Sequence, residues 1–147
     1  MKKSVLSVVL FLVLAGQLAA QDLTKVDFRL RDVDGKNFSF QEFLAEVGEG
    51  NEKGAVFISF WAMWCEPCKQ EMKALVPVFE KYRDRNFHYI AINLDNPRSL
   101  AKVKAYVKAQ KLPYHFLLDP NSEVFKKLNG QSMPYSLLVD RDGKLVA

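Results

Sequence analysis

The chain has 147 residues, of which 49% are hydrophobic and 26% are charged. This length fits one domain with a hydrophobic core of its own. The formal net charge is +4. No run of lysines or arginines with interleaved aromatic residues follows a helix face, so the composition gives little support to nucleic-acid binding.

The first twenty residues differ from the rest. Two lysines at 2–3 precede an apolar run at 8–15, and two alanines at 19–20 end the segment. This pattern is typical of a secretory signal peptide, since the apolar run is shorter than the roughly 20 residues that a spanning helix usually needs. An uncleaved anchor is the alternative. We therefore predict a signal or anchor at 1–20 and one exported, periplasmic or otherwise extracytoplasmic domain at 21–147. Without the two lysines the counts are 19 basic against 17 acidic residues, a net charge of +2.

The domain begins with short elements. Phe28 and Leu30 alternate with charged residues before a turn signal at 34–35, which predicts two short strands, the second near Asn37. Ser39 with Glu42 forms a capping-box pattern and predicts a short helix. The polar stretch at 48–54 is predicted to be a loop.

The next segment carries the strongest pattern. The compact apolar run at 55–60 predicts a strand covered on both faces, and we take it as the central strand. Apolar residues at helical spacing predict one helix from Glu66 to about Tyr82, which Pro77 should kink.

The rest of the chain alternates between strands and helices. We predict a strand at 87–94, a helix opened by Asn96-Pro97 whose residues 100, 103, 106 and 107 share a face, a strand at 115–118, a short helix at 121–128, a strand at 135–139, a turn at 140–143 and a last strand at 144–146. This order predicts an α/β fold with a largely parallel sheet and right-handed crossovers. The sequence stops where that last strand begins, so we expect a C-terminally incomplete domain that lacks a closing helix.

Two cysteines, Cys65 and Cys68, stand where the strand at 55–60 leads into the helix. A helix start favours a thiolate there, because free backbone N–H groups and the helix dipole stabilise negative charge. Cys65 is therefore the predicted nucleophile, and Cys68, three residues on, is the resolving thiol. Pro67 suits the first helical turn, where a missing N–H costs nothing.

Other interpretations of the two cysteines are weaker. A structural disulfide is usual in exported proteins, but a bridge closing so short a loop removes little entropy from the unfolded chain. Zinc needs about four ligands, and His88 and His115 are distant in the sequence, so we predict no metal and no cofactor beyond the cysteine pair.

Neighbouring side chains should tune the pair. Lys69 is placed to stabilise a Cys65 thiolate, whereas Glu66 opposes negative charge there. Glu71 follows Cys68 by three residues and could relay a proton, although an exposed helix carboxylate is the commoner role. Trp64 could shape the contact surface or be an ordinary core aromatic.

These residues resemble the thioredoxin superfamily and, within it, the exported TlpA and ResA-like branch. Residues 60–69 are similar to the family's active-site segment, residues 28–36 to its N-terminal extension, and the similarity runs to about Val146. The resemblance implies a thioredoxin-like three-layer fold around a central mixed sheet. The sequence differs from the family pattern at two positions. Ser59 stands where cytoplasmic thioredoxins carry a buried aspartate, and Lys73 stands where the family's helix proline usually falls.

The resemblance also implies roles for single residues. Glu71 matches the active-site glutamate of ResA-like proteins and is the natural substitute for the missing aspartate. Pro134 corresponds to the family's cis-proline beside the disulfide, and Met133 would offer its backbone to an extended substrate. With Trp64, Glu66 and Pro67 they form the expected substrate-binding set.

The implied function is a thiol-disulfide oxidoreductase that reduces disulfides in exported proteins. Electrons would come from a membrane thiol carrier of the DsbD or CcdA kind, in the context of cytochrome c maturation and apocytochrome c. We expect a monomer whose partners are oxidised cysteine-containing proteins. Two other functions remain open, a disulfide-forming oxidase and a non-enzymatic Cu(I)-binding module, because two thiolates also suit Cu(I).

Overall fold

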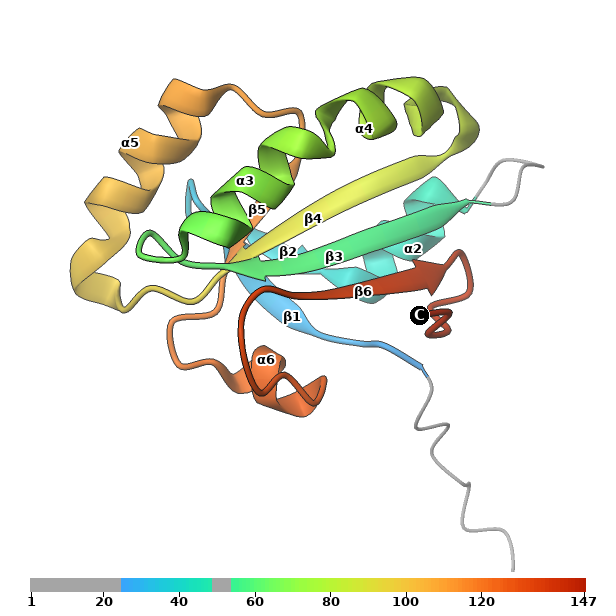
Figure 1. Ribbon diagram of the computed structural model, residues 1–147. Coiled ribbons are helices and arrows are strands. Elements are labelled where there is room, and N and C mark those ends of the chain that lie inside the picture. Colours follow the sequence, from blue (N-terminus) through green and yellow to red (C-terminus); the bar gives the residue numbers. More distant parts are fainter. Residues whose placement is uncertain (1–24, 49–53) are drawn as a thin grey trace, which may run out of the picture.

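The fold is built on one six-stranded sheet in the order β2-β1-β5-β4-β3-β6 (Figure 1). The structure is a computed structural model that describes residues 25–48 and 54–147. Within these residues the strands are β1 (Arg29–Asp32), β2 (Asn37–Ser39), β3 (Ala55–Trp61), β4 (Phe87–Asn93), β5 (His115–Leu118) and β6 (Tyr135–Asp140). The predicted strands up to β6 are confirmed to within one or two residues at each end.

The sheet is mixed, and only its middle is parallel. β3 pairs with β4 and β4 pairs with β5 in parallel, whereas β1–β2, β1–β5 and β3–β6 are antiparallel. The expectation of a largely parallel sheet therefore holds only for β5-β4-β3. β3, which we expected to be the central strand, lies between β4 and the edge strand β6. It is an interior strand, but the middle of the sheet lies between β5 and β4.

Helices cover both faces of the sheet and make three layers. The short helices α2 (Phe40–Val47) and α6 (Glu123–Lys127) pack on one face. On the other face lie α3 (Glu66–Ala74), α4 (Val76–Tyr82) and α5 (Leu100–Gln110), seen above the sheet in Figure 1. A turn of 3-10 helix at Pro97–Ser99 precedes α5, and the Asn96 side chain caps it by accepting from the Arg98 N–H at 2.9 Å.

Alternation along β3 explains the two cores. Val56, Ile58 and Phe60 point to the α2 and α6 side and are at most 1% exposed. Trp61, on the other face, is fully buried in the second core, which also contains both cysteines. Ser39 caps α2 as predicted, accepting from the Glu42 N–H at 3.4 Å.

The predicted helix from Glu66 to Tyr82 is wrong as a single element. α3 ends at Ala74, and α4 begins at Val76 after one residue, Leu75. Pro77 is the physical reason, because its nitrogen cannot donate to a carbonyl one turn back and its ring would collide with that carbonyl. In the first turn of α4 the missing N–H has no cost.

The predicted last strand is also not a regular strand. Residues 144–147 run along β6, with the Asp140 N–H donating to the Lys144 carbonyl at 2.9 Å. They form only isolated bridges, from Leu145 to Val139 of β6 and from Lys144 to Lys25. The predicted signal at 1–20 and most of the predicted loop at 48–54 lie outside the described residues. In the part of the chain that the structure describes, no helix is long and apolar enough to cross a membrane.

Two histidines pack together under α2. His88 on β4 and His115 on β5 each place their ring edge-on to Phe43, at 5.2 Å between ring centroids. Burial, and then the neighbouring His115, lower the pKa of His88; burial lowers the pKa of His115, opposed by Glu46. The folded protein therefore favours the neutral form of both rings.

This histidine pair predicts that the protein loses stability in mild acid. Because the folded pKa values are depressed, the unfolded chain binds more protons below its own histidine pKa of about 6.5, and the free energy of unfolding falls as pH drops through the folded values. Urea unfolding at a series of pH values measures this loss. His88→Gln should make the dependence shallower, and an unchanged slope would contradict the assignment.

Candidate active site

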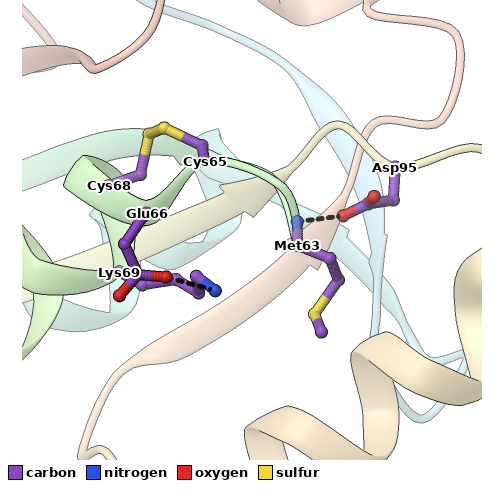
Figure 2. A network of polar contacts seen from close by, with 6 residues as sticks. All are labelled: Met63, Cys65, Glu66, Cys68, Lys69 and Asp95. Atoms are coloured by element: carbon purple, nitrogen blue, oxygen red, sulfur yellow. Dashed lines mark hydrogen bonds and ion pairs between the residues drawn. A yellow bond between two sulfur atoms is a disulfide. The ribbon is translucent and has the colours of Figure 1, made fainter.

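The loop between β3 and α3 is held by the end of β4. The Leu94 N–H donates to the Trp61 carbonyl at 2.9 Å. The Met63 N–H donates to Oδ2 of Asp95 at 2.7 Å (Figure 2). The same oxygen accepts from the Asn93 side-chain amide at 2.8 Å. Asn93, the last residue of β4, is 1% exposed, so this anchor is buried at the carboxyl end of the strand.

Cys65 and Cys68 form a disulfide at the start of α3. Their sulfurs are 2.03 Å apart and their Cα atoms 5.4 Å apart. Cys65 is the N-cap residue, with its N–H bonded to the Ala62 carbonyl at 3.0 Å and its carbonyl accepting from the Lys69 N–H at 3.2 Å. The residues are 4% and 3% exposed. The loop thus fixes the expected nucleophile at the positive end of the helix dipole.

Charged neighbours of the pair bind each other. The ammonium of Lys69 lies 2.8 Å from the Glu66 carboxylate (Figure 2). This hydrogen bond is the main cause that lowers the pKa of Glu66 and raises the pKa of Lys69. In this disulfide form Lys69 is paired with Glu66, so its charge is partly cancelled where we expected it to act on Cys65.

The predicted contact surface is exposed around the disulfide. Trp64 is 74% exposed, which excludes the core interpretation of its side chain. Glu66 and Pro67 are exposed in the first turn of α3. These three side chains therefore border the cysteine pair on the solvent side.

The Met133–Pro134 peptide bond is cis, as the resemblance implied. Tyr135, the next residue, is opposite Phe60 in the β3–β6 register, so Met133 and Pro134 lie beside the loop that leaves β3. Met133 packs against the core cluster that contains the disulfide. The fold thus brings this segment to the active-site end of the sheet.

Glu71 is half-buried on the inner side of α3. Its Oε1 accepts from the Ser136 hydroxyl at 2.8 Å. Ser59 is 4% exposed and shares a 2.8 Å hydrogen bond with the fully buried Tyr89 hydroxyl. Glu71 is therefore not an ordinary exposed helix carboxylate, and it lies on the face of the sheet that carries Ser59.

Asp95 and Ser136 were missed by the sequence reasoning. Asp95 follows directly after a strand, at the sheet edge where side chains of α/β proteins gather, and that position was an available signal. The contact between Ser136 and Glu71 joins residues 65 positions apart, so no local pattern could predict it. Among the described residues, no group of three or more histidine, cysteine or acidic side chains could hold a metal ion.

These features define a thioredoxin-like fold with a disulfide at a helix start. The chain belongs to the AhpC/TSA family, which it matches over residues 23–147. It is 31% identical over 120 residues to the thiol-disulfide oxidoreductase ResA of Bacillus thuringiensis subsp. konkukian (strain 97-27), covering 82% of this chain and 64% of that relative. The chain thus spans less than two thirds of the length of this curated relative.

Solved structures agree on the fold. The thioredoxin domain of a thiol-disulfide oxidoreductase from Bacteroides vulgatus aligns with a TM-score of 0.68 at 20% identity, over 84% of each chain. StoA from Bacillus subtilis aligns with a TM-score of 0.63 at 22% identity, over 84% of this chain and 86% of that one. At such identities the likeness shows the fold alone.

The Asp95 anchor predicts a specific loss of stability. Asp95→Ala removes the acceptor for a backbone N–H and for the Asn93 amide, and should lower the free energy of unfolding of the oxidised protein by about 1–3 kcal/mol. Asp95→Asn keeps one acceptor oxygen and should lose less. Urea unfolding compares the three proteins, and equal stability of the alanine variant would show that the anchor is not needed.

Proposed function

We propose that this protein is a thiol-disulfide oxidoreductase that reduces disulfides in exported proteins. The observation that carries the proposal is the Cys65–Cys68 disulfide at the start of α3, next to the exposed Trp64 and the cis Met133–Pro134 segment. In one cycle the reduced cysteine pair gives two electrons and two protons to a substrate disulfide. The substrate leaves as two thiols, and Cys65 and Cys68 become the disulfide.

Cys65 makes the first attack. Its thiolate displaces one sulfur of the substrate disulfide and forms a mixed disulfide, and the displaced sulfur takes up a proton. The start of α3 supports this role, because unpaired N–H groups and the helix dipole favour the thiolate over the thiol.

Cys68 completes the cycle. Its thiolate attacks the Cys65 sulfur of the mixed disulfide, the bond between Cys65 and the substrate breaks, and the substrate leaves as a second thiolate. Glu71, one helical turn from Cys68, accepts the proton that Cys68 must lose. Its half-buried position on the inner side of α3 supports this role.

The charges around the pair support a reducing role. A strong oxidant owes its power to a very stable reduced form. Here the nearest lysine is paired with Glu66, and Glu66 opposes negative charge on Cys65. This arrangement favours a reductase over a disulfide-forming oxidase.

The cellular setting is part of the same proposal. A signal or anchor at 1–20 would place the domain in the periplasm or another extracytoplasmic space. There a membrane thiol carrier of the DsbD or CcdA kind would reduce Cys65 and Cys68, and oxidised cysteine-containing proteins such as apocytochrome c would be the substrates. The similarity to the thiol-disulfide oxidoreductase ResA supports the reaction that this setting requires.

Replacing the resolving thiol should trap the substrate. In Cys68→Ser the mixed disulfide at Cys65 has no internal sulfur to attack it, so it should accumulate with a model disulfide peptide. Mass spectrometry of the intact protein measures the adduct, and Cys65→Ser is the matched control that should form none at Cys68. If Cys65 stayed unmodified in Cys68→Ser, the assigned roles would be wrong.

Removing the proton acceptor should slow exchange. Glu71→Gln keeps the shape but cannot take a proton, so reduction of the model peptide should fall by about 10²-fold near neutral pH. The variant should also change the pH dependence of the rate, because one proton-accepting group is removed. A stopped-flow pH profile checks both effects, and an unchanged profile would remove Glu71 from the mechanism.

A further inference from the structure

Two serines face each other beneath α3. Ser59 on β3 and Ser136 on β6 are register partners in the antiparallel pair. Directly opposed residues place their Cβ atoms about 4.5–5.5 Å apart on the same face of a sheet. On this face lie Trp61 and Tyr89, which belong to the core that contains the disulfide. Both hydroxyls are therefore close to the inner side of α3.

Only one of these hydroxyls bonds to Glu71. Ser59 is engaged with Tyr89, whose ring stacks on Tyr114 with 3.9 Å between centroids. The Tyr114 hydroxyl donates in turn to the Met72 carbonyl at 2.7 Å, so this branch of the network ends on the backbone of α3. Ser136 donates to Glu71 instead.

We propose that Ser136 is the positioning residue for Glu71: its hydroxyl holds the carboxylate on the inner side of α3 and stabilises the charged form that accepts the proton of Cys68. This inference rests on the proposed function. In this proposal β6, the strand that follows Pro134, also carries the residue that holds the proton acceptor in place and in its charged form. The segment beside the substrate site and the proton acceptor are thereby joined by one hydrogen bond.

The other groups around Glu71 have little influence on its carboxylate, so the Ser136 hydroxyl has a large effect on it. Tyr89 and Tyr114 are the titratable residues that the sheet places on the side of Glu71 and Ser136. Burial raises the pKa of both tyrosines, and that of Tyr114 to about 12. Both tyrosines are therefore neutral near pH 7. On α3 itself the titratable group one turn before Glu71 is Cys68, which titrates only when the disulfide is reduced. No cation forms an ion pair with Glu71 in the described ranges 25–48 and 54–147.

A neutral donor suits a group that must gain and lose a proton. When Cys68 attacks the mixed disulfide, its proton passes to Glu71, the Cys68–Cys65 bond forms and the substrate sulfur leaves with the electron pair. Ser136 donates to the carboxylate before this step, and its hydroxyl can rotate to accept from the carboxylic acid afterwards, because a hydroxyl is both donor and acceptor. A lysine partner could only donate and would hold the carboxylate charged.

The first test measures Glu71 directly in the oxidised protein, where no thiol titrates. The side-chain carboxyl ¹³C signal of Glu71, assigned by its absence in Glu71→Gln, is followed against pH. Ser136→Ala should move its midpoint upward by about one pH unit, because the charged form loses a donor. Ser136→Thr keeps the hydroxyl and should stay near the wild-type midpoint. A midpoint unchanged in Ser136→Ala would overturn the proposal.

The second test asks whether Ser136 acts through Glu71. Ser136→Ala should slow exchange and change its pH dependence in the wild-type background, and should change nothing further in a Glu71→Gln background. An equal effect of Ser136→Ala in both backgrounds would make Ser136 a merely structural residue and overturn the inference. If Glu71→Gln alone leaves the profile unchanged, the proton-relay part of the proposed function fails instead, which the ¹³C titration separates from the positioning claim.

Discussion

The attachment of the active-site loop to the end of β4 is the constraint on which the rest of the site depends. The Trp61 carbonyl and the Met63 N–H are both held by residues that follow β4, through Leu94 and the Asp95 carboxylate. With the loop fixed there, Cys65 becomes the N-cap of α3, and Cys68 stands one turn further along. The chemistry of the pair then follows from helix electrostatics, because the free N–H groups of a helix start favour a thiolate.

The packing of α3 on β3 and β6 also determines which residue could accept a proton near the cysteines. Ser59 cannot serve as the acceptor that a buried aspartate provides in cytoplasmic thioredoxins, and its hydroxyl is engaged with Tyr89. A carboxylate supplied from α3 instead of β3 reaches the same layer, and Glu71 does so with Ser136 as its donor. Since β6 also begins at the cis Met133–Pro134 bond, one strand borders the proposed substrate site and holds the proposed proton acceptor.

Much of this fold follows from local patterns, because strand and helix periodicities are local. The strands at 55–60 and 115–118, the Ser39 cap and the placement of Cys65 at a helix start could all be predicted from a few neighbouring residues. The pairing direction of the outer strands could not, since alternation is the same in parallel and antiparallel strands. Pro77 signalled a disturbance, but a kink and the full break at Leu75 give the same sequence signal. The Ser136–Glu71 and Asp95–Met63 contacts depend on tertiary register. The place of Asp95 after the predicted strand at 87–94 could have marked that residue, but not its partner.

The central claim is that the cysteine pair is a reductant, and its reduction potential tests this most directly. The protein is equilibrated with defined ratios of reduced and oxidised glutathione, and the fraction with the Cys65–Cys68 disulfide is measured after acid quenching. A reductant should have a potential nearer to that of thioredoxin, about −270 mV, than to that of the oxidant DsbA, about −120 mV. A value near −120 mV would contradict the claim and assign the protein to disulfide formation.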